Sequence, residues 1–303
     1  MTAAPAVLRF APSPTGRLHL GHALSALLND DLARAVGGRL LLRIEDTDTG
    51  RCREAFVAGI LDDLDWLGIA YEIPVRRQSE HLGDYRPIID RLTREGLLYP
   101  CFATRSQIAA AVAAAAAPPE RDPDGVPHYP GLWKDRTAEE VAACLAAGET
   151  PALRIDMARA LGRLAAEARL PLTWQAFEPD LAAATPDGVL GAGIETITAD
   201  PSRWGDAVIV RKDTPASYHL AVVVDDALQG VSHVVRGRDL LEATDLHCLI
   251  RALVGLPAPL YHHHRLLTAP DGRKLSKSLK DRSLAALRAD GATVADIRRM
   301  VGL

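Results

Sequence analysis

The N-terminal part of the chain alternates between two kinds of apolar segment, and this alternation restricts the possible folds more than any other feature. A short β-prone run, AVLRF, precedes a loop rich in proline and glycine and then a run of good helix formers that ends at Gly37-Gly38. A second strand-like run, RLLLRIEDTD, and a second helical run, EAFVAGILDDLDWLGI, repeat this order. Strand, loop, helix, strand and helix predict a parallel α/β sheet of the Rossmann-like kind.

The rest of the chain reads as an insertion, a return to the sheet and a C-terminal part. The runs DAVIVRKD, YHLAVVVDD and HVVRG resume the apolar pattern and are interpreted as buried parallel strands. A polyalanine run, a Pro/Asp/Gly stretch and a helix start at Thr137, with Glu140 as its capping-box partner, indicate an inserted α/β subdomain. The expected division is 1–100 with 193–255 for the catalytic sheet, 101–192 for the insertion, and 256–303 for a basic loop and a short helical C-terminal part.

Composition excludes a membrane protein. Hydrophobic residues make up 48% and charged residues 24% of the chain, as in ordinary globular proteins. No apolar run approaches the roughly 18 residues that span a bilayer, and the N-terminus lacks the basic start and long apolar stretch of a signal peptide. We therefore expect a cytoplasmic protein with no membrane partner.

Charge is unevenly distributed. The net charge is −4, but residues 265–303 hold nine Lys/Arg and four Asp/Glu, a local +5 that leaves −9 on the rest. A basic C-terminal part on an acidic body is compatible with the docking of a polyanion. A solvated helical surface accounts for the same charges equally well.

The turn after the first predicted strand contains HLGH, residues 19–22. In an open parallel sheet this crevice is where ligands bind, and a helix N-terminus there offers N–H groups to phosphate. Gly21 lets a ring or a phosphate approach the backbone, and the imidazoles of His19 and His22 are suitable donors to phosphate oxygens. Two histidines at this spacing are by themselves a weak signal.

A second candidate motif is DGRKLSKSLK, which runs from Asp271 to Lys280. It packs four cationic side chains around two serines, and nothing in it is suited to a core. Lys274 and Lys277 are compact mobile cations that suit a phosphate whose charge is redistributing, and Gly272 suggests a mobile loop. The alternative interpretation is a basic surface loop.

Together the two motifs change the interpretation. A His-x-Gly-His turn and a distant Lys-Leu-Ser-Lys-Ser loop resemble the two signature motifs of class I aminoacyl-tRNA synthetases. Four longer runs look like the glutamyl branch of that class: RFAPSPTGRLHLGHA, LLRIEDTD, YHLAVVVDD and HVVRGRDLL. The resemblance implies ATP-dependent activation of L-glutamate to glutamyl-adenylate. It also implies that His19, Gly21, His22 and Lys277 bind ATP, that His19, His22, Lys274 and Lys277 act in catalysis, and that Mg²⁺ accompanies ATP.

Glutamate presents two carboxylates and one ammonium. By the same resemblance Arg9 and Arg236 bind the carboxylates, since a guanidinium holds them bidentately, and Glu45 binds the ammonium. Tyr218 contributes a hydroxyl and a ring wall. The rest of the pocket is expected from the segment after Arg9, namely Phe10, Ala11, Pro12 and Ser13. Two plainer interpretations stay open: that Arg9 and Glu45 pair with each other, and that Tyr218 is simply core.

The layout resembles one family within this branch. Only 25 residues follow Ser278 here, whereas a full glutamyl-tRNA synthetase continues into a large anticodon-binding region. This is the layout of the glutamyl-Q tRNA(Asp) synthetase family, whose members esterify the queuosine base at the wobble position of tRNA(Asp). The expected partners are L-glutamate and tRNA(Asp) carrying queuosine, and we expect a monomer.

One departure from that family concerns zinc. Members often hold a zinc ion with a Cys-x-Cys pair, a Tyr and a further Cys. Here Cys101 and Tyr129 are present, but Ala103 and Trp133 stand where cysteines are expected. One thiolate and one phenol cannot close a tetrahedral site, so we expect neither structural zinc nor another metal bound by the protein. The run of histidines at 262–264 is interpreted as part of a strand rather than a metal site.

Three alternative functions stay open at this stage. A truncated glutamyl-tRNA synthetase would charge the 3′ end of a tRNA. An enzyme that adenylylates a small molecule would share the histidine turn, and a silent synthetase-like binding protein would share the fold. The contexts of Glu45, Tyr218 and Arg236 argue against the second, and intact His19, His22, Lys274 and Lys277 argue against the third.

Overall fold

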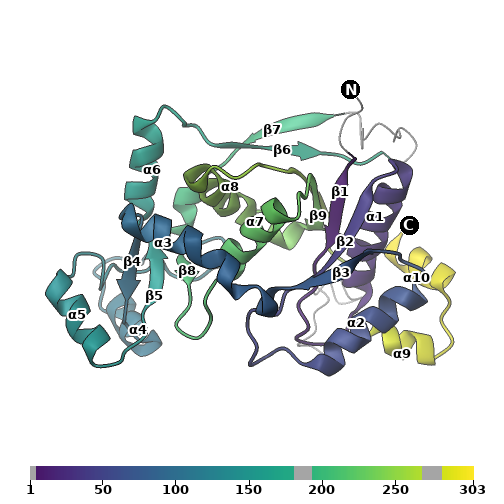
Figure 1. The fold of residues 1–303 in the computed structure, drawn as a ribbon, viewed down its shortest axis with the longest axis horizontal. Coiled ribbons are helices and arrows are strands. Elements are labelled where there is room, and N and C mark those ends of the chain that lie inside the picture. The colour runs from purple at the N-terminus through teal and green to yellow at the C-terminus, as the bar shows by residue number, and fades with distance from the viewer. Residues whose placement is uncertain (1–4, 181–192, 268–281) are drawn as a thin grey trace.

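The computed structural model describes residues 5–180, 193–267 and 282–303 (Figure 1). Its N-terminal sheet is parallel throughout and has the strand order β1 (Val7–Phe10), β2 (Arg39–Ile44) and β3 (Glu72–Arg77). Helix α1 (Leu20–Ala35) connects the first two strands and α2 (Glu54–Trp66) the next two. Every residue of β1 is buried. The predicted Rossmann-like start of the chain is confirmed.

A second sheet continues beside the first. Its order is β7, β6, β10, β9, of which only β7 runs antiparallel to its neighbour. The Ser232 N–H, just before β9, donates to the carbonyl of Val7 at 3.0 Å, so β9 lies alongside β1. The chain thus leaves β1 on one side as β2 and returns on the other as β9, which creates a topological switch point. The bounds are β6 Thr173–Phe177, β7 Ile194–Thr198, β9 His233–Gly237 and β10 Leu260–His264, with α8 at Ala243–Val254.

The prediction for YHLAVVVDD was wrong. This run is not a strand but helix α7 (Tyr218–Leu228), which lies in the middle of the molecule in Figure 1. Its residues from Leu220 to Asp226 are all buried, so the helix has no exposed face over this stretch to give a period of 3.6. Periodicity cannot separate such a helix from a buried strand, and burial overrode the β preference of three consecutive valines.

A third sheet, which is antiparallel, lies on the side of the molecule that carries α4 and α5 in Figure 1 and is called the insertion lobe below. It contains β4 (Leu98–Cys101), β5 (Ala152–Ile155) and β8 (Val208–Val210). The prediction of a parallel strand in DAVIVRKD was therefore wrong, because β8 pairs antiparallel with β5 and does not belong to the parallel sheet. The predicted capping box is confirmed at α5, where Thr137 Oγ1 accepts from the Glu140 N–H at 3.2 Å and the Glu140 carboxylate accepts from the Thr137 N–H at 2.9 Å. The helices in and beside the insertion lobe are α3 (Arg86–Arg94), α4 (Arg105–Ala113), α5 (Ala138–Ala146) and α6 (Met157–Ala166).

The C-terminal part is helical, as predicted. Helices α9 (Leu284–Ala289) and α10 (Val294–Val301) pack on α2 and α1, at the opposite end of the molecule from α5 (Figure 1). Arg298 on α10 forms a two-pronged ion pair with Asp31 on α1, at 2.7 and 2.9 Å. Buried Ile297 and Val301 join the same apolar cluster as α1, which fixes the C-terminal helices on it.

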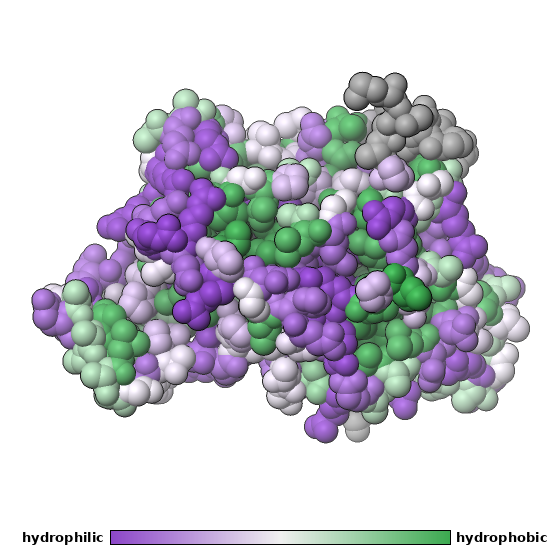
Figure 2. All heavy atoms as spheres, viewed as in Figure 1, coloured by the Kyte–Doolittle hydropathy of each residue, from purple (hydrophilic) through white to green (hydrophobic). Residues whose placement is uncertain are grey.

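The molecular surface is mixed. Figure 2 shows hydrophilic residues interspersed with smaller apolar areas on the face viewed. Across the described ranges, no helix combines the length and apolar character needed to cross a bilayer.

Candidate active site

A cavity of about 580 Å³ opens at the carboxyl ends of β1 and β9, at the switch point of the sheet. The predicted residues come to it from four separate parts of the chain: the loop after β1, the start of α1, the end of β2, and the α7–β9 unit. All of those within the described ranges line this one cavity: Arg9, Phe10, Ala11, Pro12, Ser13, His19, Gly21, His22, Glu45, Tyr218 and Arg236. Its wall also includes residues that the sequence did not single out: Ser25, Val235, Gly237, Asp239, Leu240, His264, Arg265, Leu266 and Leu267.

The HLGH turn forms a reciprocal cap at the start of α1. His19 Nδ1 accepts from the Gly21 N–H at 3.1 Å, and His22 Nδ1 accepts from the His19 N–H at 3.2 Å. Because both Nδ1 atoms accept, a neutral ring carries its proton on Nε2, where it is a hydrogen-bond donor. A Cβ at position 21 would lie 3.0 Å from the His19 ring, so any larger residue would push against the imidazole that caps the helix. No acidic residue occupies the first turn of α1, so the positive end of its dipole is not neutralised by its own helix.

The predicted lysines Lys274 and Lys277, with Gly272, lie outside the described residues. The described residues on both sides of them adjoin the cavity. Leu267 lines it before the gap, and Ser283 after the gap forms a β-bridge with His19. The Leu284 N–H also donates to the carbonyl of Leu18 at 2.9 Å. The flank that follows the basic segment is therefore fixed beside the histidine turn, and the flank that precedes it lies at the same cavity.

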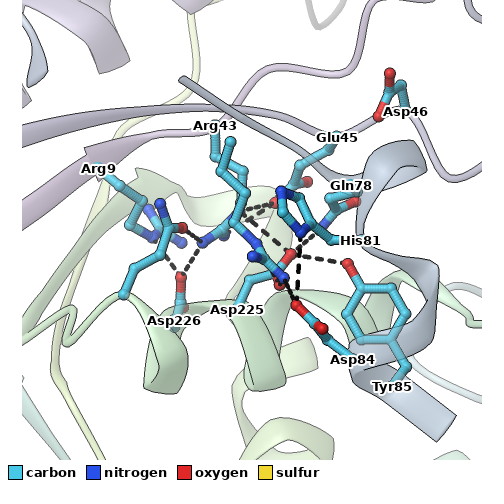
Figure 3. Close-up of polar contacts among 12 residues, drawn as sticks. Arg9, Arg43, Glu45, Asp46, Gln78, His81, Asp84, Tyr85, Asp225 and Asp226 are labelled. Atoms are coloured by element: carbon cyan, nitrogen blue, oxygen red, sulfur yellow. Dashed lines mark hydrogen bonds and ion pairs between the residues drawn. The ribbon is translucent and has the colours of Figure 1, made fainter. Parts of the chain in front are cut away.

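Arg9 and Glu45 do not pair directly but belong to one buried cluster (Figure 3). Arg9 Nε lies 3.1 Å from Asp226 Oδ1. Arg43, whose side chain is 0% exposed, lies between the two acids, with Nη1 at 2.8 Å from Asp226 Oδ1 and Nη2 at 3.1 Å from Glu45 Oε1. The plainer interpretation of a simple Arg9–Glu45 pair is therefore replaced by a chain of alternating charges.

For each of the two acids in this cluster, Glu45 and Asp226, burial raises the pKa and the neighbouring arginines lower it, and the balance differs between the two. Burial raises the pKa of Glu45, and Arg43 and Arg9 only partly offset it. Burial alone would also raise the pKa of Asp226, but Arg9, Arg43 and Arg251 outweigh it and lower this pKa to about 2. Asp226 is therefore a permanent anion at neutral pH. The Glu45 N–H donates to the carbonyl of Pro12 at 3.1 Å, which ties the end of β2 to the loop after β1.

Asp225 extends the cluster on the side away from the cavity. Its Oδ2 accepts from Gln78 Nε2 at 2.8 Å and from the Tyr85 hydroxyl at 3.0 Å, and its Oδ1 accepts from Arg76 Nε at 2.9 Å (Figure 3). Sequence reasoning missed Asp225, Asp226 and Arg43. The available signal was local: a charged residue inside the apolar run RLLLRI, and two acids directly after three valines.

Arg236 is the second predicted carboxylate ligand and is 5% exposed. Its Nη1 lies 3.5 Å from the hydroxyl of Tyr218, and both residues line the cavity. Burial raises the pKa of Tyr218 to about 12, with Arg236 opposing the rise, so this side chain stays a neutral phenol. Tyr218 is therefore part of the cavity wall rather than plain core.

The insertion has an internal hydrogen-bond cluster at the position considered for zinc. Tyr129 Oη lies 3.3 Å from Cys101 Sγ and accepts from the Trp133 N–H at 2.9 Å. The Trp133 ring packs on Phe102 with a centroid distance of 4.8 Å. In the part of the chain that the structure describes, no three His, Cys, Asp or Glu side chains are grouped in a way that could hold a metal ion. The histidines at 262–264 lie on β10, as predicted.

The cavity thus combines chemistry for three kinds of group. Two guanidinium groups suit carboxylates, one buried carboxylate suits an ammonium, and a helix start flanked by two imidazoles suits phosphate.

Comparison with known families agrees with this chemistry. Residues 6–162 and 186–300 match the family "tRNA synthetases class I (E and Q), catalytic domain". The chain is 44% identical to a glutamyl-Q tRNA(Asp) synthetase of Rhodobacter capsulatus over 98% of its own length and 100% of that relative. A second protein of that name, from Symbiobacterium thermophilum, is 39% identical over 94% of this chain and 82% of the relative.

A solved structure has the same fold over most of the chain. It is a glutamate–tRNA ligase from Elizabethkingia meningosepticum in complex with its amino acid, with a TM-score of 0.70 and 26% sequence identity. The match covers 92% of this chain but 53% of that one. This chain therefore spans about half of that ligase and the whole of the Rhodobacter relative.

Proposed function

The chain belongs to the class I tRNA synthetases for glutamate and glutamine, and on that premise we propose that it activates L-glutamate with ATP and transfers it to tRNA(Asp). The acceptor is the queuosine base at the wobble position. Similarity to glutamyl-Q tRNA(Asp) synthetases over their whole or nearly whole length favours this acceptor over the 3′ end of a tRNA.

One observation carries the proposal. Residues expected to bind glutamate and residues expected to bind ATP come from distant parts of the chain and line a single cavity at the switch point of the sheet. Arg9 and Arg236 offer guanidinium groups to the two carboxylates, and Glu45 offers a carboxylate to the ammonium. The amino acid and the nucleotide would then lie side by side, as formation of a mixed anhydride requires.

In the first step an oxygen of the glutamate α-carboxylate attacks the α-phosphorus of ATP. The bond from that phosphorus to the bridging oxygen breaks, and pyrophosphate leaves. The Nε2–H groups of His19 and His22 stabilise the charge that builds on the phosphate oxygens, and the positive end of the α1 dipole adds to this effect. Lys274 and Lys277 are proposed to neutralise the departing pyrophosphate. Mg²⁺ would accompany ATP and would be held mainly by phosphate oxygens.

In the second step a hydroxyl of the cyclopentenediol ring of queuosine attacks the acyl carbon. An ester forms, AMP leaves, and the hydroxyl proton is released. The tRNA phosphates would meet the basic residues after position 265, so binding should weaken as salt rises. These substrates place the expected activity in the cytoplasm, and the expected form is a monomer.

The test is to incubate the protein with labelled glutamate, ATP and total tRNA, and then to identify the nucleotide that carries the label. Label at the anticodon wobble position of tRNA(Asp), absent with tRNA that lacks queuosine, supports the proposal. Label at a 3′-terminal adenosine would instead indicate a truncated glutamyl-tRNA synthetase. A matched Lys277→Ala variant should lose glutamate-dependent exchange of pyrophosphate into ATP, and a full rate in that variant would exclude the proposed role of the lysine.

A further inference from the structure

The two arginines of the cavity differ in how their charges are balanced. Arg9 forms a buried ion pair with Asp226, whose carboxylate also faces Arg43 and Arg251. Arg236 is equally buried, yet no acidic side chain within the described ranges forms an ion pair with it. Burying a cation without a counter-ion costs free energy, and an anionic ligand that binds next to Arg236 would offset this cost.

Neutral groups hold the Arg236 guanidinium in place. Nη2 donates to Thr244 Oγ1 at 2.7 Å and to the Leu240 carbonyl at 3.0 Å. Nε donates to His263 Nε2 at 3.2 Å, and Nη1 lies 3.3 Å from His247 Nδ1. The longest contact runs 3.5 Å from Nη1 to the hydroxyl of Tyr218, which also lines the cavity, so this is the contact that a substrate carboxylate would replace. The other acceptors orient the guanidinium without cancelling its charge.

The hydrogen bond from Arg236 sets the tautomer of His247. A guanidinium can only donate, so His247 Nδ1 must accept and the ring proton lies on Nε2. That Nε2–H then donates to His219 Nδ1 at 3.2 Å. Burial, and secondarily the charge of Arg236, lower the pKa of His247 well below its usual range and that of His219 to about 4. Both rings are therefore neutral at physiological pH, and the pair stays an acceptor toward Arg236.

We propose that His247 is a positioning residue that aims the Arg236 guanidinium at a substrate carboxylate while leaving its positive charge unbalanced. His219 supports it by accepting from the opposite nitrogen and by packing edge-on against Trp204, at a centroid distance of 5.1 Å. The inference rests on the proposed function, because glutamate is the anion that the cavity would receive. Arg236 then gains its counter-ion only when the amino acid is bound, whereas Arg9 has one already.

Two conservative substitutions separate the two nitrogens of His247. His247→Asn places an amide oxygen near the position of Nδ1 and keeps the acceptor for Arg236. His247→Gln places its amide near Nε2, keeps contact with His219 and loses that acceptor. The assay is glutamate-dependent exchange of pyrophosphate into ATP, with KM measured separately for glutamate and for ATP.

We expect His247→Gln to raise the KM for glutamate roughly tenfold or more, since a hydrogen bond to a charged group is lost, and to leave the KM for ATP unchanged. His247→Asn should recover most of the affinity for glutamate. The control is His233→Gln, because His233 is also buried and neutral but bonds to Ser232 and does not line the cavity. Neither KM should change in the control.

Thr244→Val gives an independent route if the His247 variants fail to fold. It keeps the side-chain volume and removes the 2.7 Å contact to Arg236, so it should produce the same selective rise in the KM for glutamate. An unchanged KM for glutamate in His247→Gln, or an equal rise for glutamate and ATP, would overturn the positioning role. If the unmodified protein shows no glutamate-dependent exchange, the proposed function fails and takes this inference with it.

Discussion

Arg9 and Asp226 are 217 positions apart in the sequence, yet Arg9 Nε lies 3.1 Å from Asp226 Oδ1 in the core (Figure 3). Arg9 is on β1 and Asp226 is near the end of α7. The pair therefore joins the first strand to the central helix and fixes the position of Arg9, which lines the cavity. Because Arg43 shares the same carboxylate oxygen and Arg251 lies 3.5 Å from the other, Asp226 faces three buried cations.

Asp226→Asn should destabilise the protein strongly. The substitution keeps the shape but leaves Arg9 and Arg43 with too little negative charge in a site closed to water. We expect the free energy of unfolding to fall by about 3–5 kcal/mol, as when one partner of a buried ion pair is removed. Urea unfolding followed by circular dichroism measures the change.

The matched control is Asp90→Asn. Asp90 pairs with Arg86 on the surface of α3, and its side chain is 53% exposed, so its loss should cost less than about 1 kcal/mol. Equal losses of stability in the two variants would contradict the assignment of Asp226 as the central anion of the cluster.

Substitutions at His19 should distinguish its role as the N-cap of α1 from its proposed role as a hydrogen-bond donor to phosphate. His19→Ala removes the acceptor for the Gly21 N–H and should cost about 1 kcal/mol of stability. His19→Asn restores a good N-cap residue but has no imidazole. Both variants should lower the rate of pyrophosphate exchange by roughly 100-fold, because neither has the imidazole Nε2–H, and the shorter amide of asparagine does not extend as far toward the phosphate. Recovery of the rate in His19→Asn would show that the ring serves only as a cap.

Stability should depend on pH through the buried histidines. Burial lowers the pKa of His233 to about 4, against an unperturbed value of about 6.5. As the pH falls below about 6.5, His233 becomes protonated in the unfolded chain but stays neutral in the folded protein until the pH approaches about 4. This contribution to the free energy of unfolding therefore decreases between about pH 6.5 and about pH 4, by up to about 1.4 kcal/mol per pH unit.

Urea unfolding of the protein and of His233→Gln from about pH 7.5 to about pH 5 isolates this effect. The variant should lose stability less steeply on acidification than the unmodified protein. Parallel profiles for the two proteins would exclude a neutral folded His233.

Chelation should leave the insertion intact. Cys101 contributes a single thiol, which is hydrogen-bonded to Tyr129, and the Trp133 N–H donates to the same phenol. We therefore expect EDTA to leave the unfolding midpoint unchanged, and a fall in the midpoint would contradict the prediction that no zinc is bound. Tyr129→Phe serves as the positive control, because it removes both hydrogen bonds and should cost about 1–2 kcal/mol.

Local chemistry in the sequence was sufficient for much of the fold. The strand before the HLGH turn, the helix that ends at Gly37-Gly38 and the capping box at Thr137 are each specified by neighbouring residues, and the structure has all of them. The candidate cavity residues were also recognisable, since their types and motif contexts are properties of short segments. Helix α7 was not, because a segment buried on every side shows no periodicity.

The charge relationships around the cavity were decided by tertiary structure alone. Nothing local to Arg9 or Arg236 indicates that the first meets a carboxylate from α7 while the second meets only neutral acceptors. Side chains acquire such partners when distant segments pack together, and the strength of each contact depends on how far packing excludes water. The sequence by itself therefore determined which groups the site contains, and the folded chain determined which of them are already balanced and which await a ligand.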